Sequence, residues 1–116
     1  MLLTADTRIG AEGDFKIGLN ETAIGMTLPE FGIQLGAARL SKRHQTASLI
    51  QAQMFSPQEA VDAGFLDQLS APEALEGSTL EIAARLGKLP AAAYAGNKER
   101  SRKPYIDAIA ASLAGD

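Results

Sequence analysis

The most informative stretch of this chain reads Phe55-Ser56-Pro57-Gln58-Glu59-Ala60-Val61-Asp62-Ala63-Gly64-Phe65-Leu66-Asp67. Ser56 and Glu59 have the spacing of a capping box, in which each side chain accepts a hydrogen bond from the other residue's backbone amide. Pro57 suits the first helical position, where the N–H that proline lacks would have no partner. Gly64 suits the position just after a helix, which needs positive φ. We therefore predict a short helix here, followed by a strand over residues 65–69.

The region before this block shows short apolar and polar alternation. Such alternation at residues 7–10 and 15–19, around the turn-rich 12–14, predicts two short strands joined by a tight connection. Residues 1–6 are apolar from the first position and have no polar lead-in. We interpret them as the end of a buried helix or strand that is already under way.

The rest of the chain indicates a run of helices. Capping patterns begin at Thr27, Ser70 and Ser78, each followed three residues later by a glutamate, and Gly87 supplies a helix stop. A further helix is expected from about 41 to 53. A last helix is predicted to begin at Pro104, with an apolar stripe of Tyr105, Ile106, Ile109, Ala110 and Leu113.

The composition excludes several classes of protein. The 116 residues suffice for one compact domain, and 46% of them are hydrophobic. The net charge of −3 argues against a general nucleic-acid binder, which needs a basic field. The absence of cysteine and the single histidine argue against disulfides, thiolate catalysis and a multi-histidine metal site. Neither a membrane-spanning run nor a signal peptide is visible, so we expect a cytoplasmic protein.

Two segments carry a resemblance to a known family. The stretch from Ala5 to Glu21, with its Asp6-Thr7-Arg8-Ile9, is similar to the central segment of the enoyl-CoA hydratase/isomerase (crotonase) family. The block at 55–67 resembles that family's Ser-x-x-Glu-Ala-x-x-x-Gly-Leu-Val-Asp element. The resemblance runs from residue 1 to about 98, and it departs from the family at Asn20, where a proline usually precedes the glutamate.

The resemblance implies an α/β fold of the crotonase-like (ClpP/crotonase) type, truncated to short strands followed by a mostly helical part. Residues 1–26 would be the end of the spiral core and the active-site segment, and residues 27–116 the helical C-terminal region. The family's N-terminal half, with its oxyanion-hole amides, would lie upstream of Met1. We therefore expect the chain to be inactive on its own.

The same resemblance implies a chemistry and a site. Family members bind an acyl-CoA thioester, stabilise its enolate with two backbone N–H donors and move protons with carboxylates. Glu21 stands at the position of a catalytic glutamate, and its apolar neighbours would suit acid/base work. Gly18, Gly25, Met26 and Leu28 resemble the border of the acyl pocket, although core packing explains them equally well. Hydration or isomerisation of an enoyl-CoA is implied, by a homotrimer or hexamer that needs no metal or cofactor beyond the CoA of its substrate.

Other readings of the same residues remain open. Glu21 could be a turn carboxylate without chemistry, and the chain a non-catalytic helical interaction or oligomerisation module. For the other polar groups we favour structural roles. Asp6 and Arg8 are read as an ion pair, His44 as part of a solvated helix start, and Lys98, Arg100, Arg102 and Lys103 as a solvated helix face.

Overall fold

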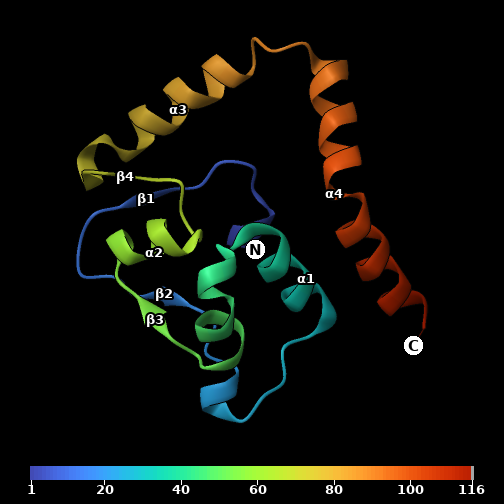
Figure 1. Ribbon diagram of the computed structural model, residues 1–116. Helices are drawn as coiled ribbons and strands as arrows, with labels where there is room; N and C mark the ends of the chain where they lie inside the picture. Colours follow the sequence, from blue (N-terminus) through green and yellow to red (C-terminus); the bar gives the residue numbers. More distant parts are fainter. Residues whose placement is uncertain (116) are drawn as a thin grey trace.

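The computed structural model describes residues 1–115 and contains four α-helices and four short strands. The first two helices lie next to each other, and the last two form an arch that begins beside the strands and ends beside the first helix (Figure 1). The Cα radius of gyration is 15.7 Å, whereas a compact domain of this length is expected at about 13.4 Å. The helices are α1 (Glu30–Arg39), α2 (Pro57–Ala63), α3 (Leu75–Leu86) and α4 (Ala91–Ala114), and the strands are β1 (Ile9–Ala11), β2 (Ile17–Gly18), β3 (Met54–Phe55) and β4 (Gln68–Ser70).

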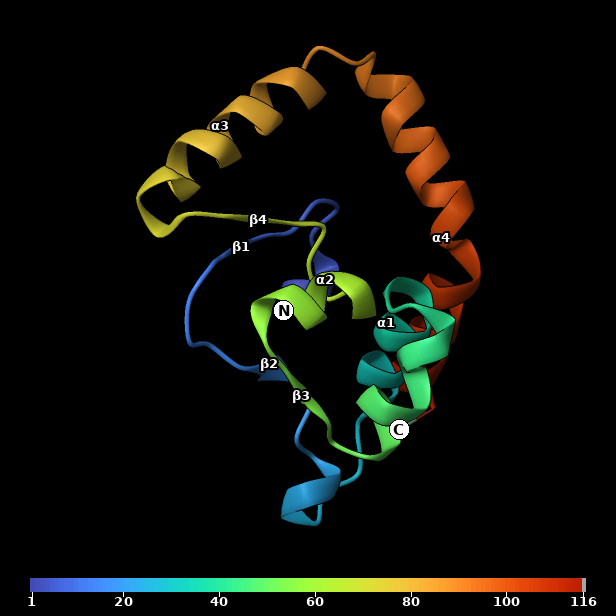
Figure 2. The same ribbon diagram turned by 60° about the vertical axis from the view of Figure 1, so that its left-hand side comes forward.

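The strands pair in an order that the local alternation did not predict. β1 pairs in parallel with β4, with Ile9 opposite Gln68, and β2 pairs antiparallel with β3, with Ile17 opposite Phe55. The predicted hairpin between the first two strands is therefore wrong. Strands β3 and β4 flank α2 in the sequence, so the continuous segment 54–70 supplies the partner of each early strand (Figure 2). The predicted strand after α2 is confirmed, although it begins at Gln68.

The core is built mainly from the block at 55–67. Seven apolar side chains form the buried core of the described residues, and five of them come from this block. The rings of Phe55 and Phe65 lie 5.7 Å apart between centroids. The buried apolar residues are Leu3, Leu40, Phe55, Ala60, Ala63, Phe65 and Leu66. In the N-terminal segment 1–6 only Leu3 is buried, in a 3-10 turn over Leu2–Thr4, so the expected buried element there is reduced to one side chain.

Both ends of α2 match their predictions. The Ser56 hydroxyl accepts a hydrogen bond from the Glu59 amide at 3.2 Å, and the Glu59 carboxylate accepts one from the Ser56 amide at 3.0 Å. This capping box lowers the pKa of the Glu59 carboxyl through the hydrogen bond from the Ser56 backbone. Gly64 has φ of 98°, and a Cβ there would lie 2.9 Å from the Arg39 carbonyl oxygen. Only glycine fits both requirements.

Several other helix boundaries differ from the predictions. Pro29, rather than Thr27, is the N-cap of α1, and α3 begins at Leu75, so neither Ser70 nor Ser78 caps it. The hydroxyl of Ser70 instead donates to the Ala71 carbonyl. The region 41–53 forms a 3-10 turn (Lys42–His44) and a π-helix (Thr46–Ile50) rather than an α-helix. Two more 3-10 turns occur at Thr22–Ile24 and Pro72–Ala74.

The last helix is longer than predicted. α4 begins at Ala91, so Pro104 lies inside it. Proline is tolerated poorly in a helix interior because it removes one backbone hydrogen bond. Pro104 is exposed, so the carbonyl that loses its partner can bond to water. Tyr105 and Ile109 are partly buried on the side that faces α1, whereas Ile106, Ala110 and Leu113 are exposed. The predicted apolar stripe is therefore correct only for its first and middle members.

Candidate active site

An apolar cavity of about 380 Å³ lies between the N-terminal turn, β2 and the start of α1. Glu21 is the one charged side chain among the residues that line it. Apolar lining with few polar groups is the usual composition of a small-molecule site. The lining residues are Met1, Leu2, Leu3, Ile17, Gly18, Leu19, Glu21, Leu28, Pro29, Phe31, Gly32, Leu35 and Phe65.

The turn that carries Glu21 fixes its backbone. Its carbonyl oxygen accepts hydrogen bonds from the amides of Ile24 at 3.1 Å and Met26 at 2.8 Å. Gly25 closes the turn in the left-handed conformation, with φ of 77°. This tight turn places the Glu21 side chain at the cavity wall, directly after β2.

The carboxylate of Glu21 has an unused oxygen. Its Oε2 atom is buried and has no hydrogen-bond partner within the part of the chain that the structure describes. Buried polar atoms normally have a partner, and one without it is a candidate for binding a ligand or a water. This oxygen can therefore accept a proton, or hydrogen-bond a molecule held in the cavity.

The four predicted substrate-binding residues divide into two pairs. Gly18 and Leu28 line the cavity with Glu21, whereas Gly25 and Met26 do not. Met26 is 58% exposed, and the space around the missing Cβ of Gly25 is open within 4 Å. At Gly18 a Cβ would lie 2.8 Å from the Gln53 carbonyl oxygen, because β3 passes close by. The residues that sequence reasoning did not assign to the site include Leu3, Leu35 and Phe65, which no local pattern distinguishes from core.

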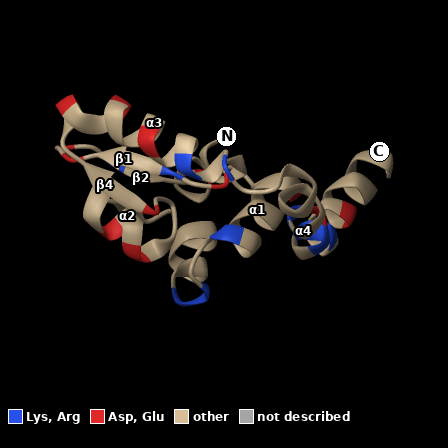
Figure 3. Cartoon of the chain, turned by 90° about the horizontal axis from the view of Figure 1, so that it is seen from above, with Lys and Arg blue, Asp and Glu red and all other residues tan. Residues whose placement is uncertain are grey.

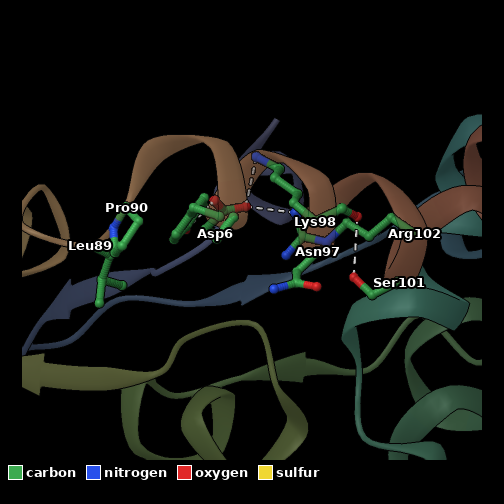
Figure 4. A pocket seen from close by; sticks show the side chains of 9 residues that line it. Asp6, Leu89, Pro90, Asn97, Lys98, Ser101 and Arg102 are labelled. Atoms are coloured by element: carbon green, nitrogen blue, oxygen red, sulfur yellow. Dashed lines mark hydrogen bonds and ion pairs between the residues drawn. The ribbon is translucent and has the colours of Figure 1, made fainter.

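A second cleft, of about 470 Å³, lies between α4 and the turn before β1 (Figure 4). Asp6 accepts hydrogen bonds from the Tyr94 hydroxyl and from Arg102, both at 2.6 Å, and pairs with Lys98 Nζ at 2.9 Å. Partial burial on its own raises the pKa of the Asp6 carboxyl. The hydrogen bonds from Tyr94, Lys98 and Arg102 outweigh this effect and bring the pKa well below its usual range. The same bond to Asp6 raises the pKa of the Tyr94 hydroxyl.

The predicted Asp6–Arg8 ion pair is wrong because each residue has other partners. Arg8 is buried and donates to the carbonyls of Ala5, Gly64 and Phe65 at 2.8–2.9 Å. Its own amide donates to the Asp67 carboxylate at 2.7 Å. Arg8 thus ties the N-terminal segment to the end of α2, and it holds the backbone of Phe65 at the wall of the Glu21 cavity.

Two further polar predictions also need correction. Lys98 and Arg102 are not simply solvated, because both are bound to Asp6. His44 is partly buried, with its ring 6.2 Å from that of Phe55 in an edge-on arrangement. Among residues 1–115 we find no cluster of three or more metal-ligating side chains and no helix apolar and long enough to cross a bilayer.

Comparisons with known proteins identify the fold of this chain and the family to which it belongs. The fold is that of the crotonase superfamily, and the chain spans about half the length of the solved structures it matches. The family model described as enoyl-CoA hydratase/isomerase matches residues 1–116, and the chain belongs to this family. No curated protein matches the chain in sequence.

Three solved structures illustrate the likeness. An enoyl-CoA hydratase/isomerase family protein from Pseudomonas syringae is 44% identical, with a TM-score of 0.94, and the match covers 99% of this chain and 50% of that one. An enoyl-CoA isomerase from Mycobacterium tuberculosis is 32% identical, with a TM-score of 0.92 over 98% of this chain and 50% of its own. The human mitochondrial Δ3-Δ2-enoyl-CoA isomerase is 28% identical, with a TM-score of 0.89, covering 96% of this chain and 43% of its own.

Proposed function

We propose that this chain contributes the acid/base carboxylate and part of the acyl pocket of an enzyme that hydrates or isomerises an enoyl-CoA thioester. The observation that carries the proposal is Glu21, whose buried Oε2 lies at the wall of an apolar cavity and has no hydrogen-bond partner among residues 1–115. Membership of the enoyl-CoA hydratase/isomerase family supplies the substrate class.

The proposed chemistry is proton transfer. For isomerisation, Glu21 would take a proton from the carbon next to the thioester carbonyl and return it to the far carbon of the original double bond, so that the double bond shifts by one position toward the thioester. For hydration, it would take a proton from the water whose oxygen adds to the β-carbon, or deliver a proton to the α-carbon. Such positioned acid/base groups contribute about 10²- to 10⁴-fold to a rate. The steps use only carboxylates and the CoA of the substrate, so we propose no metal and no separate cofactor.

The negative charge of the enolate must also be stabilised, usually by two backbone N–H donors. The resemblance places these donors in the half of the family fold that the chain does not span. We therefore propose that the chain alone binds acyl-CoA weakly and turns it over very slowly.

Calorimetric titration of the chain with crotonyl-CoA and acetoacetyl-CoA tests the binding step. We expect measurable binding that weakens when Leu28→Asp places a charge in the apolar wall. The matched control is Glu30→Gln, which alters an exposed carboxylate outside the cavity and should leave binding unchanged. Equal binding by all three proteins would contradict a role for the cavity.

We also propose a homotrimer or hexamer that serves acyl-CoA metabolism, including that of fatty acids, in the cytoplasm. Exposed leucine and isoleucine side chains on α3, on α4 and on the connection between them support self-association. They include Leu80, Leu89, Ile106 and Leu113. Light scattering coupled to gel filtration measures the mass, and a strict monomer would contradict the proposal.

The alternative function is a non-catalytic helical interaction module. One observation favours it: neither α3 nor α4 contributes a buried residue, so much of the surface of both helices remains available to a partner. A chain that self-associates but does not bind either acyl-CoA would support the module over the enzyme.

A further inference from the structure

The helix α4 is attached to the rest of the molecule with little apolar burial. Of its 24 residues, none is buried, and residues 91–101 are all exposed. The connection from α3 runs through Gly87-Lys88-Leu89-Pro90, where Leu89 is 49% exposed. The hydrophobic effect therefore contributes little to holding the first half of α4 in place.

Among residues 1–115, the side chains that bind the carboxylate of Asp6 all come from α4. Tyr94, Lys98 and Arg102 follow one another at four-residue spacing, so they lie on one face of the helix. The three side chains bind a single carboxylate, and Figure 4 shows Lys98 and Arg102 directed at it. Next to this contact, the partly buried stripe of Arg102, Tyr105, Ile109 and Ser112 faces α1.

The acceptor, in contrast, belongs to the fixed part of the molecule. Arg39 of α1 donates to the carbonyl of Asp6 at 2.8 Å and to that of Ala5 at 3.1 Å. Arg8 also donates to the Ala5 carbonyl, at 2.8 Å. The Asp6 carboxylate is thus held on the core side while its three partners sit on the helix that extends away.

Positive charge accumulates at this contact. Arg8, Arg39, Lys98 and Arg102 gather around Asp6, and Asp67 is the other acid nearby. Burial, together with the charges of Arg8 and Arg102, lowers the pKa of the Arg39 guanidinium. Figure 3 shows that the basic residues of α4 gather in one stretch of this helix, which lies beside α1. If the carboxylate were neutral, these cations would repel α4 from the core.

We propose that Asp6 is an electrostatic clasp and that α4 is a strap, which docks on α1 when the clasp is closed and swings away about residues 87–90 when it is broken. Eight of the nine residues that line the cleft belong to α4 or the connection before it, so opening the strap separates these residues from Asp6 and exposes the face of α1 on which α4 docks. The proposal depends on these contacts alone and is independent of any activity at Glu21.

The test measures the distance between a spin label on α4 and one on the core by pulsed electron paramagnetic resonance. The full chain has no cysteine, so Asp62→Cys on α2 and Glu99→Cys on α4, both exposed, give a unique label pair. The variant Asp6→Asn removes the charge of the clasp. Its matched control, Asp107→Asn, breaks the exposed ion pair between Lys103 and Asp107 on the same helix and leaves Asp6 intact.

We expect one narrow distance peak in the parent and in Asp107→Asn, and loss of that peak to a broad, longer distribution in Asp6→Asn. The double variant Lys98→Met, Arg102→Met removes the clasp from the strap side and should give the same loss. If Asp6→Asn does not fold, the double variant decides alone. A parental peak in the folded variants that lack the clasp would overturn the proposal.

Discussion

Glu21 is the residue on which the proposed chemistry depends. In a chimera that joins the first half of the Pseudomonas syringae relative to this chain, we expect Glu21→Gln to lower kcat by about 10²- to 10⁴-fold, since an amide cannot take up the proton. The measurement is the loss of the ultraviolet absorbance of crotonyl-CoA. Glu30→Gln should retain the parental rate. An undiminished rate in Glu21→Gln would leave the carboxylate as a turn residue only.

Gly64 combines a positive φ with a close approach of the backbone of Arg39. We expect Gly64→Ala to lower the free energy of unfolding by at least about 1–2 kcal/mol, the cost of a left-handed alanine, with more added by the close approach to Arg39. Urea unfolding followed by circular dichroism measures the change. Gly77→Ala is the control, because it lies inside α3 with nothing within 4 Å, and it should stabilise by about 0.5–1 kcal/mol.

At this scale the sequence predicts a residue well when its partners are near in the chain. The capping pair Ser56 and Glu59 is three residues apart, and its geometry is as predicted. For Asp6 the local sequence predicts Arg8, two residues away, as the partner. Its carboxylate instead binds Tyr94 and Arg102, which lie 88 and 96 residues further along the chain. No local pattern contains that information, since it depends on how α3 and the connection after it direct α4.

The capping box is the element-scale feature that can be tested most directly. We expect Ser56→Ala to lower the free energy of unfolding by about 1 kcal/mol, because the amide of Glu59 loses its acceptor. Thermal unfolding is the measurement. The control is Thr27→Ala, at a site where the sequence suggests a cap but α1 instead starts after Pro29. A comparable loss in Thr27→Ala would mean that the two patterns are equivalent after all.

The helices that were misplaced share a physical cause. Pro104 predicts a helix start because proline is favoured in the first turn. In the structure it lies inside α4, which runs for 24 residues from Ala91 to Ala114. Ser78 has the spacing of a cap but falls inside α3, where Thr79 donates to the Leu75 carbonyl. Capping signals indicate where a helix can start, but they do not exclude a start further upstream. The pairing of β1 with β4 joins segments far apart in the chain, so no local pattern contains it.

At the scale of the whole molecule, the two sites differ in what they require. The Glu21 cavity is built from segments close to the core block, and Gly18 and Leu28 line it together with Glu21. The catalytic role that the family resemblance implies for Glu21 stays a prediction. The strap depends on the extended shape, which the composition alone does not predict. The sequence predicted the family and the helical C-terminal part, but not that α3 and α4 would lie outside the core.

The docking of α4 depends on the charge of the Asp6 carboxylate, so it can be tested by measuring the position of α4 as a function of pH. Hydrogen bonds from the strap hold the pKa of the Asp6 carboxyl well below its usual value, which is about 3.9 for an unperturbed aspartate. A carboxyl whose pKa is lowered by its contacts stabilises those contacts fully at pH values above its unperturbed pKa. This stabilisation is lost as the pH falls through the lowered pKa. The labelled parent should therefore keep its narrow distance peak at about pH 4 and lose it only in stronger acid.

The control for this experiment is the clasp variant itself. Asp6→Asn has no carboxyl to protonate, so its distance distribution should be broad at neutral pH and should not change over the range in which the parent opens. A parental midpoint near the ordinary aspartate value would contradict the clasp, because it would show that Tyr94, Lys98 and Arg102 do not favour the charged form in solution. An Asp6→Asn variant that opens only in acid would contradict it as well, since some other carboxyl would then control the strap.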